Sequence, residues 1–171
     1  MNNRENIEIR HAEPDDYKAI HAIFSQPGAY SGTLQLPHTS AEIWKDRLLL
    51  DPGRGFSLIA LVRGEIVGNC GLLLNQHSAR RSHCAWLGMG VRDDWQGRGV
   101  GTALLQATLD KADNWLNILR VELTVFADNQ AAIHLYEKNG FETEGRHKKY
   151  AFRNGEFVDS LAMARLNDRR F

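Results

Sequence analysis

The chain has 171 residues, 43% of them hydrophobic, and is long enough to bury the core of one domain. Its 21 Lys and Arg side chains balance 21 Asp and Glu side chains, so the formal net charge is zero. This balance argues against a protein whose main task is to bind nucleic acid, because such binding depends on excess positive charge. We therefore expect a single domain over residues 1–171 that has no nucleic-acid partner.

The two cysteines, Cys70 and Cys84, each lie within an apolar stretch of the sequence. Two thiols are too few for a disulfide scaffold, and they lack the local spacing of a zinc site. We expect buried free thiols and no metal. No apolar run approaches the ~18 residues of a membrane span, and no signal pattern precedes the first strand. The cytoplasm is the expected location, without membrane contact.

The first third of the chain predicts one strand and two helices. Apolar and polar residues alternate at 7–10, as in a short strand, and Pro14 within an acidic turn is typical of a helix start. Residues 26–39 combine glycine, two prolines and polar residues with apolar side chains, which indicates an ordered loop suited to form a substrate wall. Ser40 is the candidate N-cap of the second helix.

The rest of the chain alternates between strands and two more helices. Strands are expected at residues 56–62, 66–74, 84–91, 121–126, from 141 onward, and at 157–166. One helix follows the strand at 84–91, and another covers residues 129–139, with Gly140 just beyond its end. The Asn154-Gly155 pair predicts a tight hairpin. The order β-α-α-β-β-β-α-β-α-β-β indicates a mixed α/β (α+β) domain.

A glycine-dense turn at residues 96–102 joins the strand at 84–91 to a helix. Gly99 and Gly101 have no Cβ, so main-chain N–H groups can turn toward an anion. The helix adds its unpaired N–H groups and the positive end of its dipole. Its apolar stripe contains Leu104, Leu105, Thr108, Leu109, Ala112, Trp115 and Leu116. The turn therefore predicts a pyrophosphate site beside a helix that packs on a sheet.

Three phosphate-binding patterns compete for this turn. A P-loop requires Lys and then Ser or Thr after its last glycine, but Thr102 and Ala103 follow Gly101. A Rossmann loop follows the first strand and pairs with an acid at the end of the next strand, whereas Glu122 lies within its strand. The third pattern, Q/R-x-x-G-x-G/A, matches residues 96–101.

The third pattern, after an apolar strand and at the start of a helix, resembles the GNAT N-acetyltransferase superfamily. Asn129 and the Tyr-x-x-x-Gly-Phe segment at 136–141 are similar to the corresponding segment of that family. The resemblance extends over nearly the whole chain and implies a mostly antiparallel sheet with splayed central strands, flanked by helices. Further segments resemble bacterial L-amino acid N-acetyltransferases, which acetylate the α-amino group of free amino acids such as phenylalanine and methionine; these segments are 33–38, 80–83, 113–116, 122–126 and 148–156.

The resemblance implies acetyl-CoA as the acetyl donor. Its pyrophosphate is expected at the main chain of Gln96, Gly97, Arg98, Gly99, Val100, Gly101 and Thr102. The pantetheine arm is expected along the opened edge of the preceding strand, at Met89, Gly90 and Val91, with a hydrogen bond from Asn129. Three alternatives stay open: the strand glycines only form a bulge, Arg98 faces solvent, and Asn129 only caps its helix.

Tyr136 lies seven residues after Asn129 and therefore on the same face of the helix. The resemblance implies that it protonates the departing CoA thiolate. A phenol titrates near ~10 and a thiol near ~8.5, so full proton transfer is uphill by about 2 kcal/mol. This difference favours donation in step with C–S cleavage, or hydrogen bonding alone. The alternative is a core tyrosine without chemistry.

The general base and the acceptor site are less well defined by the sequence. Many relatives place a Glu on the strand before the turn, and residues 84–89 contain none. Glu122, His83 and His38 are the base candidates, and ordered water is a further alternative. Acceptor specificity is expected in the 30–38 loop and in the Asn154-Gly155 hairpin. Within that loop, apolar side chains suit an apolar substrate, and two polar residues suit a carboxylate: Tyr30, Leu34 and Leu36, with Gln35 and His38.

The sequence predicts an N-acetyltransferase for a small-molecule amine, with the α-amine of a free apolar amino acid preferred. Alternative acceptors are polyamines, protein N-termini and amine antibiotics. A polyamine site should be rich in carboxylates, and residues 26–39 contain none. From a different class of protein, an acyl-CoA-binding regulator without catalysis is a further alternative. If the chain forms a homodimer, its C-terminal strands would supply the interface.

Overall fold

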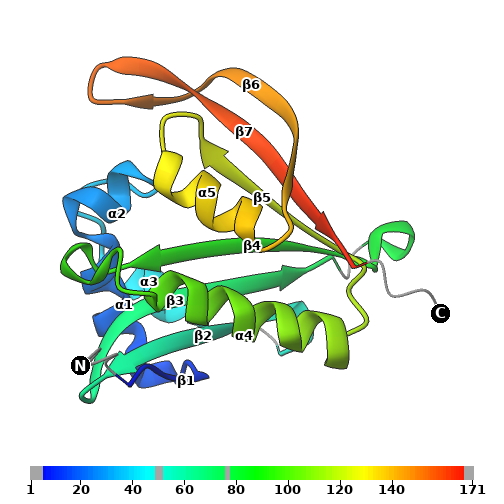
Figure 1. Cartoon of the computed structure of the whole chain (residues 1–171). Coiled ribbons are helices and arrows are strands. Elements are labelled where there is room, and N and C mark those ends of the chain that lie inside the picture. The colour runs from blue at the N-terminus through cyan, green and yellow to red at the C-terminus, as the bar shows by residue number, and fades with distance from the viewer. Residues whose placement is uncertain (1–5, 49–51, 76–77, 168–171) are drawn as a thin grey trace, which may run out of the picture.

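The computed structural model describes residues 6–48, 52–75 and 78–167. Within these ranges one sheet has the strand order β1-β2-β3-β4-β5-β7-β6, with helices on both of its faces (Figure 1). Every neighbouring pair of strands is antiparallel except β4 and β5, which run parallel. This topology confirms the predicted mixed, mostly antiparallel α/β fold.

The elements follow the chain in nearly the predicted order. The strands are β1 (Glu8–His11), β2 (Gly55–Val62), β3 (Glu65–Leu74), β4 (Cys84–Val91), β5 (Arg120–Phe126), β6 (Glu142–Arg153) and β7 (Glu156–Leu166). The helices are α1 (Tyr17–Phe24), α2 (Pro27–Ser31), α3 (Ala41–Leu48), α4 (Val100–Trp115) and α5 (Gln130–Lys138). Short 3₁₀ turns are η1 (Pro14–Asp16), η2 (Pro52–Arg54), η3 (Ala79–Arg81) and η4 (Asp93–Trp95).

The local signals at three element ends behave as the sequence predicted. Asn154 and Gly155 both have positive φ, 50° and 84°, as a two-residue hairpin turn between β6 and β7 requires. The Ser40 hydroxyl accepts a hydrogen bond from the N–H of Glu42 at the start of α3. Gly140, with φ of 86°, follows the end of α5. Short-range chemistry alone defined these ends.

The segment at 26–39 departs from the expected loop, because it contains α2. Pro27 occupies the first turn of this helix, where its missing N–H costs no helical hydrogen bond. The N–H of Gly32 bonds to the carbonyl of Gly28 at 3.1 Å and completes the turn. A helix this short has too few residues for an apolar stripe to repeat, so its composition resembles that of a loop.

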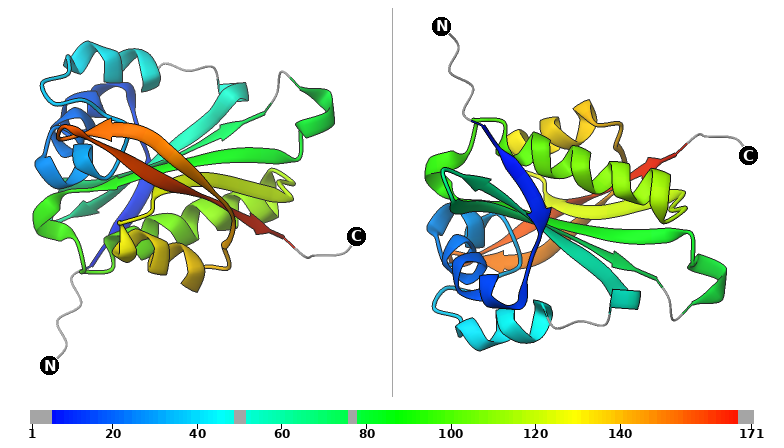
Figure 2. Two further views of the ribbon diagram at one scale, coloured as in Figure 1. Left: turned by 90° about the horizontal axis from the view of Figure 1, so that it is seen from above. Right: turned by 90° about the horizontal axis from the view of Figure 1, so that it is seen from below.

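The sheet separates two apolar clusters. On one face, α4 and α5 cover the strands, and Leu104 and Leu105 of α4 are fully buried there. On the other face, α1 and α3 cover a smaller cluster in which the Phe24 and Trp44 rings stack at 4.4 Å between centroids. The two views of Figure 2 show these helix groups on opposite sides of the sheet. Cys70 and Cys84 are both buried and free, as the sequence predicted.

Trp115 is an exception in the predicted apolar stripe of α4. It is the last residue of the helix and is 78% exposed. The chain reverses after it, where Asn117 has a φ of 52° and the N–H of Ile118 bonds to the carbonyl of Ala112 at 3.0 Å. Ile118 thereby fills the core position at this end of the helix. The prediction for Trp115 was wrong because a spacing rule cannot anticipate a chain reversal.

The parallel strands β4 and β5 separate along their length. Their pairing runs from Cys84 opposite Arg120 to Trp86 opposite Glu122, and the described strands are not paired beyond that point. The register of β4 with β3 is continuous from Ala85 to Val91, without a bulge. The later half of β4 thus keeps one edge free toward β5, as splayed central strands require. No helix among the described residues is long and apolar enough to cross a membrane.

Candidate functional site

A cavity of about 1090 Å³ lies where β4 and β5 separate. The segment of β4 from Trp86 to Val91 lines it, together with residues from both faces of the sheet. On one face the lining comes from α1, α2 and α3, and on the other from α5 and from α4, through its first turn and Lys111. The divergence of two parallel strands therefore places both helix layers at one site.

The two glycines within β4 serve different purposes. A Cβ on Gly90 would lie 2.5 Å from the Phe24 ring, so this position lets α1 approach the sheet closely. A Cβ on Gly88 would meet nothing within 4 Å, and Gly88 lines the cavity. Close packing of Phe24 thus accounts for Gly90, whereas Gly88 leaves the cavity wall without a side chain.

The turn before α4 has the backbone shape of an anion cradle. Gly97 and Gly99 have φ of 72° and 88°, in the left-handed region that favours glycine. Both line the cavity, and a Cβ on either one would meet nothing within 4 Å, so backbone conformation explains the glycines. The first helical bond joins the N–H of Ala103 to the carbonyl of Gly99 at 3.0 Å. The N–H groups of the residues between them therefore precede the helical ladder, at the positive end of the α4 dipole.

Gly101 plays a different part from the one that the sequence indicated. It lies inside α4, and a Cβ there would be 3.2 Å from Cδ2 of Leu135 and 3.7 Å from Cε of Met89. Its missing side chain allows α4 to lie close to α5 and β4 at the cavity wall. It does not give the turn its conformation, which belongs to Gly97 and Gly99.

The cavity brings together most of the residues that the sequence assigned to the cofactor. Those that line it are Met89, Gly90, Val91, Gln96, Gly97, Gly99, Gly101, Thr102 and Asn129, together with Tyr136. Arg98 and Val100 are outside the lining. The guanidinium of Arg98 stacks 4.9 Å above the Trp95 ring, and the Val100 side chain is buried in the core.

Tyr136 lies on α5, and Asn129 lies at the start of this helix. The Asn129 side chain accepts a hydrogen bond from the N–H of Ala132 at 3.2 Å, so it does cap the helix. Tyr136 is only 7% exposed and packs against the Phe141 ring. Burial, with a smaller contribution from Cys70, raises the pKa of the Tyr136 phenol well above its usual range. The phenol is therefore a neutral hydrogen-bond donor at physiological pH.

Two hydrogen bonds tie α2 to the anion cradle. The N–H of Gly28 donates to Oδ2 of Asp93 at 2.9 Å, and the N–H of Asp93 donates to Oε1 of Gln26 at 2.7 Å. Asp93 begins η4, directly ahead of the glycine turn. The segment that sequence analysis expected to form a substrate wall is thus bonded to the segment expected to bind phosphate.

Only part of the predicted acceptor group lines the cavity. Leu34 and Gln35 do, while Tyr30 and His38 are outside the lining. None of the three candidate bases lines the cavity either. Glu122 is bound instead by the guanidinium groups of Arg81 and Arg120. In the described parts of the chain, no group of three or more His, Cys, Asp or Glu side chains is placed to hold a metal ion.

Sequence analysis missed several polar and aromatic residues of the wall. They are Arg47 of α3, Ser57 of β2, Asn69 of β3, Trp86 of β4 and Tyr150 of β6. These residues come from five different elements, so no local spacing connects them. One signal was present in β4, because Trp86, Gly88 and Gly90 alternate with core residues and so share the face away from α4.

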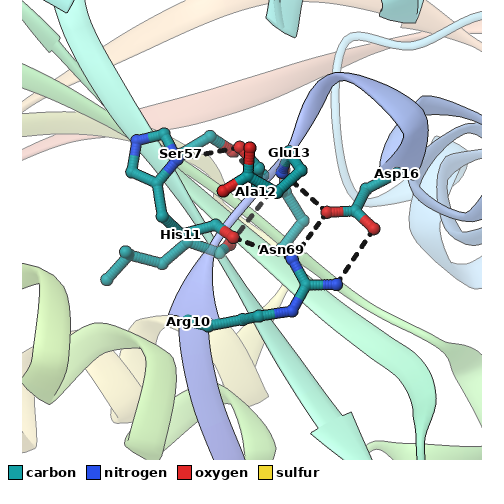
Figure 3. Close-up of polar contacts among 8 residues, drawn as sticks. Arg10, His11, Ala12, Glu13, Asp16, Ser57 and Asn69 are labelled. Carbon is teal, nitrogen blue, oxygen red and sulfur yellow. Dashed lines mark hydrogen bonds and ion pairs between the residues drawn. The ribbon is translucent and has the colours of Figure 1, made fainter.

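Asn69 and Ser57 form a polar pair in this wall. The Asn69 amide donates to Oγ of Ser57 at 2.7 Å and to the carbonyl of Leu58 at 3.0 Å. Figure 3 shows the pair beside the junction of β1 and η1, where Arg10 and Asp16 form an ion pair. Two neighbouring strands are therefore joined by side chains at the cavity wall.

The site and the fold agree with a known family. The sequence profile of the acetyltransferase (GNAT) family matches residues 17–141, and the chain belongs to this family. It is a GNAT N-acetyltransferase, and enzymes of this family use acetyl-CoA.

Individual relatives support the same assignment. The L-amino acid N-acetyltransferase AaaT of Escherichia coli (strain K12) is 49% identical over 160 residues, which cover 94% of this chain and 98% of AaaT. A GNAT-family acetyltransferase from Streptococcus pneumoniae has a TM-score of 0.81 at 27% identity, and the match covers 95% of this chain and 100% of that one. The structure of yncA from Salmonella typhimurium, solved with its cofactor acetyl-CoA, has a TM-score of 0.82 at 19% identity. This match covers 96% of this chain and 95% of that one.

Proposed function

We propose that this enzyme transfers the acetyl group of acetyl-CoA to the α-amino group of a free L-amino acid, with apolar amino acids such as phenylalanine or methionine preferred. The observation that carries the proposal is one cavity that joins the glycine cradle of α4 to a chamber on the opposite face of the sheet. The similarity to AaaT supports an amino acid as the acceptor.

The cradle fits a pyrophosphate. Gly97 and Gly99 are in the left-handed region, a Cβ on either would meet nothing within 4 Å, and the α4 dipole favours an anion at the turn. The edge of β4 that β5 leaves unpaired beyond Trp86 fits the amide groups of a pantetheine arm along Met89 and Gly90, and the Val91 carbonyl at its end accepts a hydrogen bond from Nε2 of Gln96 at 3.3 Å. A main-chain N–H on this edge would also polarise the acetyl carbonyl, as an oxyanion hole does.

Tyr136 is the proposed donor to the departing sulfur. Bound acetyl-CoA supplies an activated acyl carbon and a thiolate leaving group. Because burial raises the pKa of Tyr136, complete proton transfer to a thiolate is even less favourable than for free phenol and thiol. Tyr136 therefore donates a hydrogen bond that strengthens as the C–S bond breaks, and Asn129 at the start of the same helix positions the arm.

The acceptor amine must lose a proton before it attacks, and such amines titrate near ~8 or above. Because Glu122, His83 and His38 are outside the cavity lining, we propose that solvent in the cavity removes this proton. The rate should then rise with pH as the free amine becomes more abundant.

The charges of the cavity favour an amino acid over a polyamine. Among the described lining residues, Glu13 is the only carboxylate, whereas Arg47 and Lys111 are both cationic. A polyamine carries several positive charges and needs several carboxylates to bind them. The exposed Leu34 side chain in the same lining fits an apolar substrate.

A thiol-release assay with acetyl-CoA tests the proposal. The panel contains free amino acids, polyamines and peptides with free N-termini, each at matched concentration. We expect the fastest release with phenylalanine or methionine. A preference for a polyamine or a peptide would reject the assignment of an amino acid as the acceptor. If coenzyme A binds by calorimetry but no amine causes thiol release, the protein is a non-catalytic regulator.

A further inference from the structure

Arg47 is held in a fixed position at the acceptor side of the cavity. It lies in the last turn of α3 and lines the cavity. Its Nη1 donates to Oε1 of Gln35 at 3.1 Å, and its guanidinium lies 4.7 Å from the centre of the Trp44 ring. Trp44 is itself buried and stacked on Phe24. An amide and an aromatic face thus contact the guanidinium of this exposed side chain and favour one orientation of it.

The positive charge of Arg47 has no carboxylate partner within residues 6–48, 52–75 and 78–167. By contrast, Arg165 pairs with Asp113 and Arg81 pairs with Glu122. A guanidinium has five N–H donors in a planar fork that matches a carboxylate. Within the same ranges, its hydrogen bonding is confined to the contact with Gln35. The remaining donors suit an anionic group of a ligand.

The wall of the same cavity also contains apolar side chains that are not buried in the core. Leu34, Leu73 and Trp86 are each substantially exposed and line the same cavity. A zwitterion with an apolar side chain has a carboxylate, an amine and an apolar group on one carbon. In a cavity with an arginine and an apolar wall, the arginine suits the carboxylate and the wall suits the apolar group.

We infer that Arg47 binds the α-carboxylate of the acceptor and thereby selects free amino acids over amines that lack this group. The inference rests on the proposed function and names the residue that determines its substrate class. Gln35 is a positioning residue, because it acts by orienting the guanidinium. The apolar side chain of the substrate then lies against Leu34, Leu73 and Trp86.

The test compares phenylalanine with phenylalaninamide, which keeps the ring and the amine but has no carboxylate. For Arg47→Gln, the KM for phenylalanine should rise on the order of tenfold to a hundredfold, since a charged hydrogen-bond partner is lost. The KM for phenylalaninamide and the KM for acetyl-CoA should change little. Arg47→Lys should recover part of the preference, because it keeps the charge but loses the planar fork.

Lys45→Gln is the matched control, because it removes one positive charge from the same helix at a residue that pairs with Glu42 and is outside the cavity lining. It should leave both KM values unchanged. Circular dichroism and thermal unfolding verify that each variant is folded.

The outcomes separate the two claims. An equal rise in the KM for phenylalanine and phenylalaninamide would show that Arg47 only supports the wall, and an unchanged KM for phenylalanine would exclude carboxylate binding. Either result overturns this inference and leaves the proposed function intact. Failure of the unaltered enzyme to acetylate any amino acid overturns the proposed function, and this inference with it.

Discussion

Burial sets the protonation state of Tyr136 before any substrate is present. The phenol lies on the buried face of α5 against the Phe141 ring, and its removal from water disfavours the charged form. Its proton is therefore retained across the whole range in which the acceptor amine becomes deprotonated. One residue can stay a donor while the amine loses its proton, which acetyl transfer to an amine requires.

Replacement of this hydroxyl gives the first prediction. Tyr136→Phe should lower kcat on the order of tenfold to a thousandfold, with the KM for acetyl-CoA nearly unchanged, because the lost contact strengthens only as the sulfur departs. Steady-state thiol release measures both constants. Tyr17→Phe, a tyrosine of α1 outside the cavity lining, is the control and should retain full activity. Unaltered turnover by Tyr136→Phe would remove it from the mechanism.

The Cys70 thiol makes the stability of the fold depend on alkaline pH. Burial raises its pKa from 9.0 to about 12. Between these values the unfolded chain releases the thiol proton while the folded chain keeps it. The free energy of unfolding therefore falls as pH rises through this window, by up to about 1.4 kcal/mol per pH unit for this group.

Cys70→Ala should flatten this alkaline decline, because it removes the group that ionises. Denaturant unfolding of both proteins at a series of pH values from 8 to about 11 measures the slope. The variant should be less stable at neutral pH, since a buried sulfur is lost, and the difference should shrink as pH rises. Parallel slopes for the two proteins would contradict this account.

Among the elements, α4 depends on close contact with its neighbours as well as on its N-terminal turn. Gly101→Leu places a side chain where the Cβ alone would lie 3.2 Å from Leu135. The leucine side chain should push α4 away from α5 and raise the Kd for coenzyme A by about tenfold or more. Titration calorimetry measures this Kd. Gly145→Leu on β6, where a Cβ meets nothing within 4 Å, is the control and should bind normally.

The hydrogen bonds between α2 and η4 join the proposed acceptor wall to the glycine turn. A change in η4 should therefore alter the KM for the acceptor. Asp93→Ala removes the acceptor for the N–H of Gly28 and also the longer contact of Oδ1 with Nε2 of Gln96 at 3.4 Å, so α2 should lose part of its anchor. We expect the KM for the amino acid to rise about fivefold at saturating acetyl-CoA, as for the loss of the stronger of these two hydrogen bonds. Asp94→Ala, which instead loses a partner of Arg92, should have a smaller effect. Equal effects of the two variants would argue that the anchor has no role.

At the scale of the whole molecule, the end of the sheet at β6 and β7 remains open. Phe152 and Phe157 are 66% and 62% exposed, and their rings meet edge to face at 5.2 Å. Exposed aromatic pairs on an edge strand are typical of surfaces that associate. We propose that a second copy of the chain covers this hairpin.

Sedimentation equilibrium tests this assembly. The native chain should sediment as a dimer, and the combined change Phe152→Ser and Phe157→Ser should shift it toward the monomer. Trp115→Ser, which removes a still more exposed aromatic residue from the end of α4, should leave the dimer intact. A native chain that sediments as a monomer at all concentrations would reject the proposal.

The sequence by itself determined every described strand and helix except α2, and the chemistry of several of their ends. Strand alternation, the Asn154-Gly155 turn and the glycines before α4 act over a few residues, so they are readable without knowledge of the fold. The spacing of Asn129 and Tyr136 likewise assigned them to one helix face, and both line the cavity. Here local geometry was sufficient.

Only the tertiary structure decided where β4 and β5 separate, which neighbours leave no room for a side chain at Gly101, and which residues line the cavity. Arg47, Asn69 and Trp86 come from elements distant in sequence, and they share a wall because strand pairing and helix packing bring them together. A periodic pattern states which face of an element is apolar but not what lies opposite that face. The glycine turn is one continuous segment and could therefore be located from the sequence, whereas the five wall residues from separate elements could not.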